Sequence, residues 1–153
     1  MTHRRPVRAL TSLSSLQVKL RTVATDDIQP KRFAKEFLSL HSEFAGRATD
    51  TRKRWKKQGE DNTVDVDLSE LHTNPMKVVQ KIYASFRIEL SGRSRNKMER
   101  WLQNDGARGK HGSNEYKAEW FGLENQESVL NEYPRLREYD NFYCSMFDCR
   151  NTK

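Results

Sequence analysis

The sequence has little of what several protein classes require. Among its 153 residues are only two cysteines, four histidines and four prolines, and hydrophobic residues make up 35%. No apolar run approaches the roughly 20 residues that a helix needs to cross a bilayer, and no apolar segment typical of a secretory signal opens the chain. We therefore predict a soluble chain without a membrane span, large enough for one domain at most.

The cysteines and histidines form no metal-binding pattern. Cys144 and Cys149 are five residues apart, which matches neither common zinc sites nor thioredoxin-like motifs, so they are either free thiols or a pair near the C-terminus. Three of the histidines fall at predicted loop or terminal positions, and the four are scattered: His3, His41, His72 and His111. We expect no metal site.

Positive charge is in excess. The chain has 28 basic and 21 acidic residues and a net charge of +7. This balance favours an anionic partner, such as a phosphorylated nucleotide, nucleic acid or anionic lipid, without choosing among them. No acid precedes Asp26, and the serines and arginines before it are also typical of a mitochondrial transit peptide.

Two helices are predicted in the first 58 residues. Apolar residues recur every three or four positions after Pro6, as in a transit helix or a helix of the fold. From Pro30 to about Gln58, a long amphipathic helix places these residues on one face: Phe33, Phe37, His41, Phe44 and Ala48. We expect His41 to be packed in the core and hydrogen-bonded.

The end of the long helix is basic. Segment 52–57 holds five cations around Trp55. Basic residues in a last turn complement the helix dipole and most often form a solvated face. The alternative is a small basic helical module that binds RNA or DNA through these cations and Trp55.

One strand is predicted, at Thr63–Leu68, where apolar and polar residues alternate. A single strand leaves its backbone donors and acceptors unpaired. We therefore expect it to pair with another chain or with strands missing upstream. The nearby acids Asp65, Asp67 and Glu70 are expected to solvate its outer face or cap the next turn.

More helices are expected after the strand. Asn74 and Pro75 are typical of a helix start, and the predicted buried stripe comprises Val78, Val79, Ile82, Tyr83 and Phe86. A helix containing Met98, Trp101 and Leu102 should end near Gly106, before a glycine-rich loop over residues 106–116. Short helices are expected near 124–131 and after Pro134.

Several motifs occur in an order that resembles the C-terminal portion of a PAPS-dependent sulfotransferase. Thr63–Leu71, Asn74-Pro75 and Val78–Tyr83 look like the late strand, acidic turn and helix of that broad family. Similar to its closing loop and following turn are Gly109–Gly112, Tyr116 and Phe121–Leu123. Thr2–Pro6 resembles the family's Thr-His-Arg-Asp-Pro, with Arg5 in place of the Asp; Leu68 stands where many members have an aromatic residue.

The resemblance implies a set of ligand-binding residues. Arg4 and Ser12 would bind the 3'-phosphate of the co-substrate PAPS, and a basic loop would cover it: Arg108, Lys110, His111 and Gly112. An arginine fork and a hydroxyl suit phosphate oxygens, and a glycine-rich loop lets backbone amides approach them. The sulfuryl group would pass to a hydroxyl or amine acceptor that the sequence does not identify.

The resemblance also implies an α/β fold with a P-loop-like parallel sheet, of which this chain would hold a mainly helical part. The partial domain would span residues 1–143, with a C-terminal tail at 144–153. The family's 5'-phosphosulfate loop and catalytic base lie upstream of Arg4, so no catalytic residue is assigned. We expect the chain alone to be inactive and to bind adenosine 3',5'-bisphosphate weakly. A cytoplasmic location is favoured over a Golgi or mitochondrial one.

Overall fold

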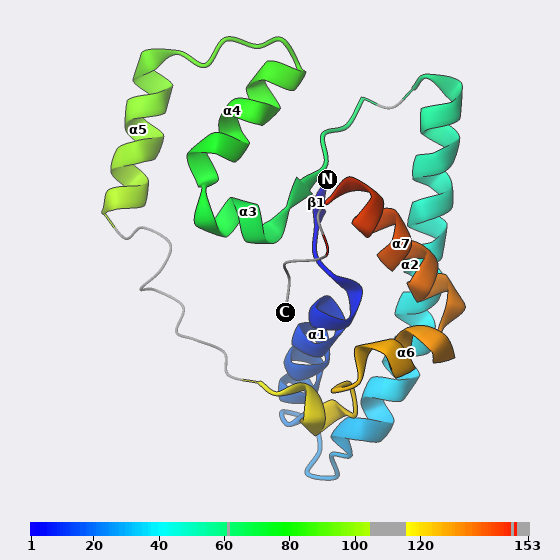
Figure 1. Ribbon diagram of the computed structural model, residues 1–153. Coiled ribbons are helices and arrows are strands. Elements are labelled where there is room, and N and C mark those ends of the chain that lie inside the picture. The colour runs from blue at the N-terminus through cyan, green and yellow to red at the C-terminus, as the bar shows by residue number, and fades with distance from the viewer. Residues whose placement is uncertain (61, 105–115, 148, 150–153) are drawn as a thin grey trace. The chain divides into compact units, whose positions relative to one another are not determined.

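The computed structural model describes residues 1–60, 62–104, 116–147 and 149 (Figure 1). The protein is mainly helical, as predicted, with 73% helix and a two-stranded parallel sheet. The chain divides into two compact units. The smaller unit comprises Met1–His3 and Thr63–Glu115, and the larger unit comprises Arg4–Asn62 and Tyr116–Lys153. Within the described ranges, no helix is both long and apolar enough to span a membrane.

The larger unit contains the predicted helices of both chain segments. They are α1 (Pro6–Arg21), α2 (Pro30–Gln58), α6 (Gln126–Glu132) and α7 (Pro134–Met146), with a 3-10 turn, η1 (Ala118–Phe121), that the sequence did not indicate. α2 is 29 residues long and ends at Gly59, whose φ of 72° lies in the left-handed region that glycine adopts without a Cβ clash. Cys149 forms a disulfide with Cys144 of α7.

The core of the larger unit forms where α1, α7 and η1 pack against α2 (Figure 1). Its buried apolar residues come from five segments: Val7, Leu10, Ala34, Leu38, Phe121, Leu123, Val129, Leu130 and Leu136. Ala34 is completely buried, whereas Phe44 is 51% exposed. The predicted buried face of α2 is therefore wrong beyond its first turns.

Small residues define the buried face of α2. Ser42, Gly46 and Thr49 are buried on it together with Ala34 and Leu38. Small side chains let two helix backbones approach closely, and α7 packs on this stripe. Spacing alone predicted a buried aromatic stripe and missed these small residues. The size of the facing side chains decides which stripe of a helix is covered.

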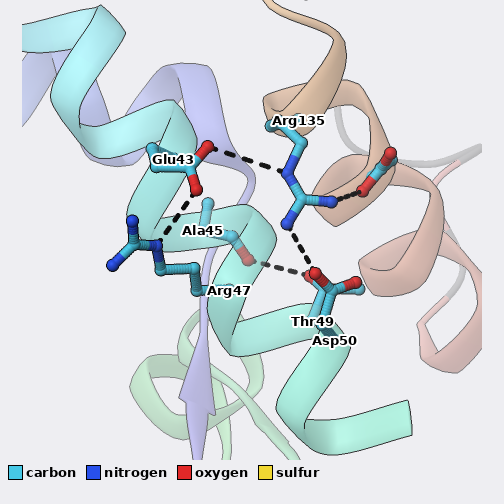
Figure 2. Close-up of polar contacts among 7 residues, drawn as sticks. Glu43, Ala45, Arg47, Thr49, Asp50 and Arg135 are labelled. Atoms are coloured by element: carbon cyan, nitrogen blue, oxygen red, sulfur yellow. Dashed lines mark hydrogen bonds and ion pairs between the residues drawn. The ribbon is translucent and has the colours of Figure 1, made fainter.

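Arg135 of α7 lies on this stripe, between two carboxylates of α2 (Figure 2). One guanidinium nitrogen, Nη2, is 2.5 Å from Asp50 Oδ2, and Nε is 3.9 Å from Glu43 Oε2. A Cβ atom on Gly46 would lie only 2.3 Å from Nε of Arg135. The absence of a side chain at Gly46 therefore makes room for the guanidinium.

The surroundings of His41 on α2 differ from the predicted hydrogen-bonded environment. The ring of His41 packs between Phe37 and Phe44, at centroid distances of 5.1 and 5.8 Å. Its Nε2 atom is buried and has no hydrogen-bond partner within the structure described. The prediction of a satisfied imidazole is wrong for this atom, and burial lowers the pKa of His41.

The sheet of the smaller unit is shorter than predicted. β1 (Thr2–His3) pairs in parallel with β2 (Val66–Asp67), so the expectation that the partner strand lies outside this chain is wrong. β2 ends where Asp67 caps α3 (Leu68–Thr73), its carboxylate accepting a hydrogen bond from the Ser69 amide. The predicted capping role of this acid is confirmed. His72 lies in α3, not in a loop as predicted.

Helices α4 (Pro75–Ser85) and α5 (Gly92–Gln103) complete the smaller unit. The predicted buried stripe of α4 is largely open, because only Val78 on this helix is buried. Phe86 is 46% exposed and Trp101 of α5 is 53% exposed. The physical reason is a shortage of neighbours: within the smaller unit, α4 packs on α3, which has only 6 residues, and on α5.

Candidate anion-binding site

Arg4, Ser12 and Tyr116 meet within the larger unit. Nη2 of Arg4 donates a hydrogen bond of 3.3 Å to Oη of Tyr116 across 112 positions of sequence. Ser12 is also hydrogen-bonded to this phenol. Arg4 and Ser12, which the resemblance implies for phosphate binding, thus share Tyr116 as a partner. Tyr116 itself belongs to the motifs that carry the resemblance.

The start of α1 positions the first two of these residues. Arg5 is the N-cap and Pro6 is the first helical residue, which suits a position whose N–H is unpaired in any helix. Arg4 therefore lies one residue before the N-cap. Arg8 and Ser12 are four residues apart along α1, so both lie on one side of it.

Tyr116 belongs to the second chain segment of the larger unit. It lies two residues before η1, whose Phe121 is buried in the core. Tyr116 itself is half-buried and packs against the core. The phenol is therefore fixed by η1, while its hydroxyl group reaches the residues at the start of α1.

The cluster is electropositive. Burial by itself raises the pKa of Tyr116, but hydrogen bonds with Ser12 and Arg4 and the positive charges of Arg4 and Arg8 bring this pKa below its usual value. Arg8 is exposed. Among the described residues, no carboxylate forms an ion pair with Arg4 or Arg8.

Arg5, which replaces the family's aspartate, has a structural partner. Its Nη2 atom is 3.5 Å from Oδ2 of Asp140 on α7, and both side chains are largely buried. The pair ties the start of α1 to α7. Arg5 is thus paired, whereas Arg4 and Arg8 form no ion pair with any described residue.

The helix end itself adds to the positive field. α1 has 16 residues, and no side chain in the described part of the chain caps its N-terminus. Unpaired amides at a helix N-terminus and the helix dipole both favour an anion. The cluster of Arg4, Arg8, Ser12 and Tyr116 next to this helix end is called the anion cluster below.

The predicted loop residues Arg108, Lys110, His111 and Gly112 lie outside the described residues. Their proposed role over the phosphate stays a prediction. In the parts of the chain that are described, no group of three or more His, Cys, Asp or Glu side chains could hold a metal ion.

No family model, no curated protein and no solved structure matches this chain. The described residues show no P-loop sulfotransferase fold. The family resemblance therefore rests on the motifs alone, and the candidate site rests on its own geometry.

A buried pair in the smaller unit was missed by the sequence analysis. Nε2 of His3 lies 2.7 Å from Oδ1 of Asp65, and the two side chains are 2% and 16% exposed. Parallel pairing of β1 with β2 brings them together. The sequence signal that could have indicated this pair is the alternation that places Asp65 and Asp67 on one face of the strand. The enclosed imidazole thus links β1 to the residue that precedes β2.

The basic end of α2 is mostly solvated, as predicted. Lys53, Arg54, Lys56 and Lys57 are exposed, and Trp55 is 36% exposed. Arg52 is the exception, because only 2% of it is exposed and it continues the buried face of α2. Lys56 also lies over the ring of Phe142 on α7, with Nζ 5.4 Å from the ring centroid.

Proposed function

We propose that this chain is a sulfotransferase-family protein whose anion cluster binds the 3'-phosphate of PAPS, the donor of a sulfuryl group to a hydroxyl or amine. The observation that carries the proposal is the convergence of Arg4 and Ser12 on Tyr116. Arg4 and Ser12 belong to the first motif of the resemblance and Tyr116 to the last, and the contact between them agrees with the shared phosphate site that the resemblance implies.

The chemistry of the anion cluster suits a phosphate dianion. An arginine guanidinium matches phosphate oxygens with two parallel N–H donors, and Arg4 and Arg8 supply two such groups. Ser12 and Tyr116 add neutral hydroxyl donors. Bound phosphate would take over the contact that Arg4 makes with Tyr116, which at 3.3 Å is long for a hydrogen bond to an arginine.

Sulfuryl transfer proceeds by in-line displacement, and an enzyme promotes it by positioning the reactants and stabilising developing charge. In this proposal the anion cluster anchors the donor through a group remote from the reacting sulfur. Remote binding energy of this kind supports orientation at the reacting centre. The residues that would hold the 5'-phosphosulfate are not assigned, so we propose weak nucleotide binding and no turnover by this chain alone.

Matched nucleotides test the proposal. Adenosine 3',5'-bisphosphate and adenosine 5'-monophosphate differ only in the 3'-phosphate, and calorimetry would compare their affinities. We expect the bisphosphate to bind about tenfold more tightly, a difference typical of one charge-assisted contact set. Arg4→Gln should abolish the preference, whereas Arg32→Gln, which changes an exposed arginine of α2 that is paired with Glu36, should keep it.

Two results would contradict the proposal. Equal affinity for the two nucleotides would remove the 3'-phosphate site, and so would an unchanged preference in Arg4→Gln. Transfer of radioactive sulfate from PAPS by the purified chain would refute the inactivity of this chain while leaving the anion cluster in place.

A second candidate function is nucleic-acid binding at the end of α2. Its specific observation is the exposed group of four cations around a partly exposed Trp55. Affinity for a single-stranded oligonucleotide should then fall steeply between low and physiological salt, and Trp55→Ala should weaken it through lost base stacking. No retention on a nucleic-acid column at low salt would eliminate this candidate.

A further inference from the structure

The smaller unit contains an apolar cavity between α4 and α5, which lie side by side in Figure 1. The cavity has a volume of about 320 Å³. It is formed by the first turns of α4 and the last turns of α5, and its lining residues are Pro75, Met76, Val79, Lys97, Met98, Trp101 and Leu102. This volume lies at the lower end of the range for small-molecule sites in proteins.

The lining of the cavity is apolar with one charged group. Met76, Val79, Met98 and Leu102 are aliphatic or thioether side chains, and only Lys97 carries a charge. Methionines adapt their shape to an irregular ligand, and a lysine can lay its stem along an apolar surface with the ammonium in water. The lining therefore selects an apolar body with a negative head group.

Cations continue along one edge of the cavity. Arg93, Lys97 and Arg100 are spaced four and three residues apart on α5, so they form a stripe beside the apolar residues. Among the described residues, none of the three forms an ion pair. Segment 75–104 holds seven basic and two acidic residues, a net charge of +5.

We propose that this cavity binds a free amphiphilic carboxylate, such as a medium-chain fatty acid, with its chain against Met76, Met98 and Trp101 and its carboxylate at Lys97. The charge of the segment disfavours a second copy of this chain as occupant, because two such surfaces repel each other. The apolar lining is confined to the first turns of α4 and the last turns of α5, which suits one short acyl chain better than the extended plane of a bilayer. The proposal is independent of the anion cluster, so either can fail alone.

The four methionines provide a site-specific test. Met76 and Met98 line the cavity, whereas Met1 and Met146 lie elsewhere in the chain. Dodecanoate would be titrated below its micellar concentration into the full chain labelled with ¹³C at the methionine methyl groups. We expect saturable shifts of the Met76 and Met98 methyl signals and none of the Met1 and Met146 signals.

Head-group charge and Lys97 give matched controls. Dodecanol, with the same chain and no charge, should bind at least threefold more weakly, as expected for loss of one exposed ion pair. Lys97→Gln should remove that difference, whereas Lys31→Gln on α2 should keep it. The comparison of dodecanoate with dodecanol needs no variant, so it stands even if a substitution prevents folding.

Other outcomes would overturn the proposal. Equal shifts of all four methyl signals would indicate non-specific detergent-like binding. Equal affinities for dodecanoate and dodecanol would remove the role of Lys97. Shifts of Met76 and Met98 that appear only with vesicles of phosphatidylserine, or only with an acidic amphipathic peptide, would assign the surface to a membrane or to a protein partner instead.

Discussion

The guanidinium of Arg4 donates a hydrogen bond to the hydroxyl group of Tyr116, although 112 positions of sequence separate the two residues. This contact closes the larger unit by joining the start of α1 to the segment that leads into η1. It also gathers the arginine, serine and tyrosine on which the proposed function depends.

The titration of Tyr116 tests the electrostatics of this cluster. We expect Tyr116 to lose its proton at lower pH than Tyr133, whose pKa is raised by burial and by the charge of Glu132. Spectra of the chain labelled with ¹³C at the tyrosine Cζ atoms would follow both residues in one sample. Arg4→Gln should raise the pKa of Tyr116 and leave that of Tyr133 unchanged.

The sign of the linked stability follows from the lowered pKa. Because Tyr116 releases its proton more readily in the folded chain, its contribution to the free energy of unfolding grows as pH rises toward its ordinary pKa of 10.0. Titration of Tyr116 at or above the pH at which Tyr133 titrates would contradict the described cluster.

His41 predicts a loss of stability in mild acid. Burial lowers the pKa of this imidazole below its ordinary value of 6.5, so the folded chain binds fewer protons than the unfolded chain. The contribution is fully present above pH 6.5 and is lost as pH falls below it. Urea unfolding at several pH values would show a smaller pH dependence in His41→Phe.

A matched control for this prediction is Leu40→Phe, which changes an exposed residue of α2 that does not titrate. It should leave the pH dependence of unfolding unchanged. An identical pH dependence for wild-type and His41→Phe would show that the imidazole between Phe37 and Phe44 is not the responsible group.

Gly46 and Arg135 are expected to be coupled. Alanine in a helix interior is more stable than glycine by about 1 kcal/mol, so Gly46→Ala should gain this amount when Arg135 is also replaced by alanine. With Arg135 present the gain should shrink or reverse, because the new Cβ would lie 2.3 Å from Nε and displace the guanidinium from Asp50. A double-mutant cycle from urea unfolding measures the coupling. Additive effects would show that the guanidinium does not depend on the space at Gly46.

Arg87, in the turn after α4, predicts a stabilising substitution. Its φ of 54° is left-handed, a conformation that costs a residue with a Cβ about 1 kcal/mol and costs glycine little. Arg87→Gly should therefore increase hydrogen-exchange protection of the α4 amides. Arg87→Ala removes the same charge and keeps the Cβ, so it should give no such increase. Equal protection in the two variants would mean that charge, and not backbone conformation, controls this turn.

The sequence by itself determined where most helices begin. All four prolines, Pro6, Pro30, Pro75 and Pro134, are the first residues of helices. Proline has its φ fixed near the helical value and lacks an N–H that the first turn leaves unpaired, so this is a local effect. The end of α2 at Gly59 and the cap at Asp67 also depend on the residue type at the helix boundary, so both could be predicted from the sequence.

Only the tertiary structure decided which helix faces are covered and which distant groups meet. α2 buries its small residues instead of its aromatic stripe, because close packing with α7 and the placement of Arg135 over Gly46 require space. Arg4 reaches Tyr116, and His3 reaches Asp65, only because segments far apart in sequence are folded together. Local preferences depend on a few neighbouring residues, whereas burial and long-range contacts depend on the shapes of all the packed elements.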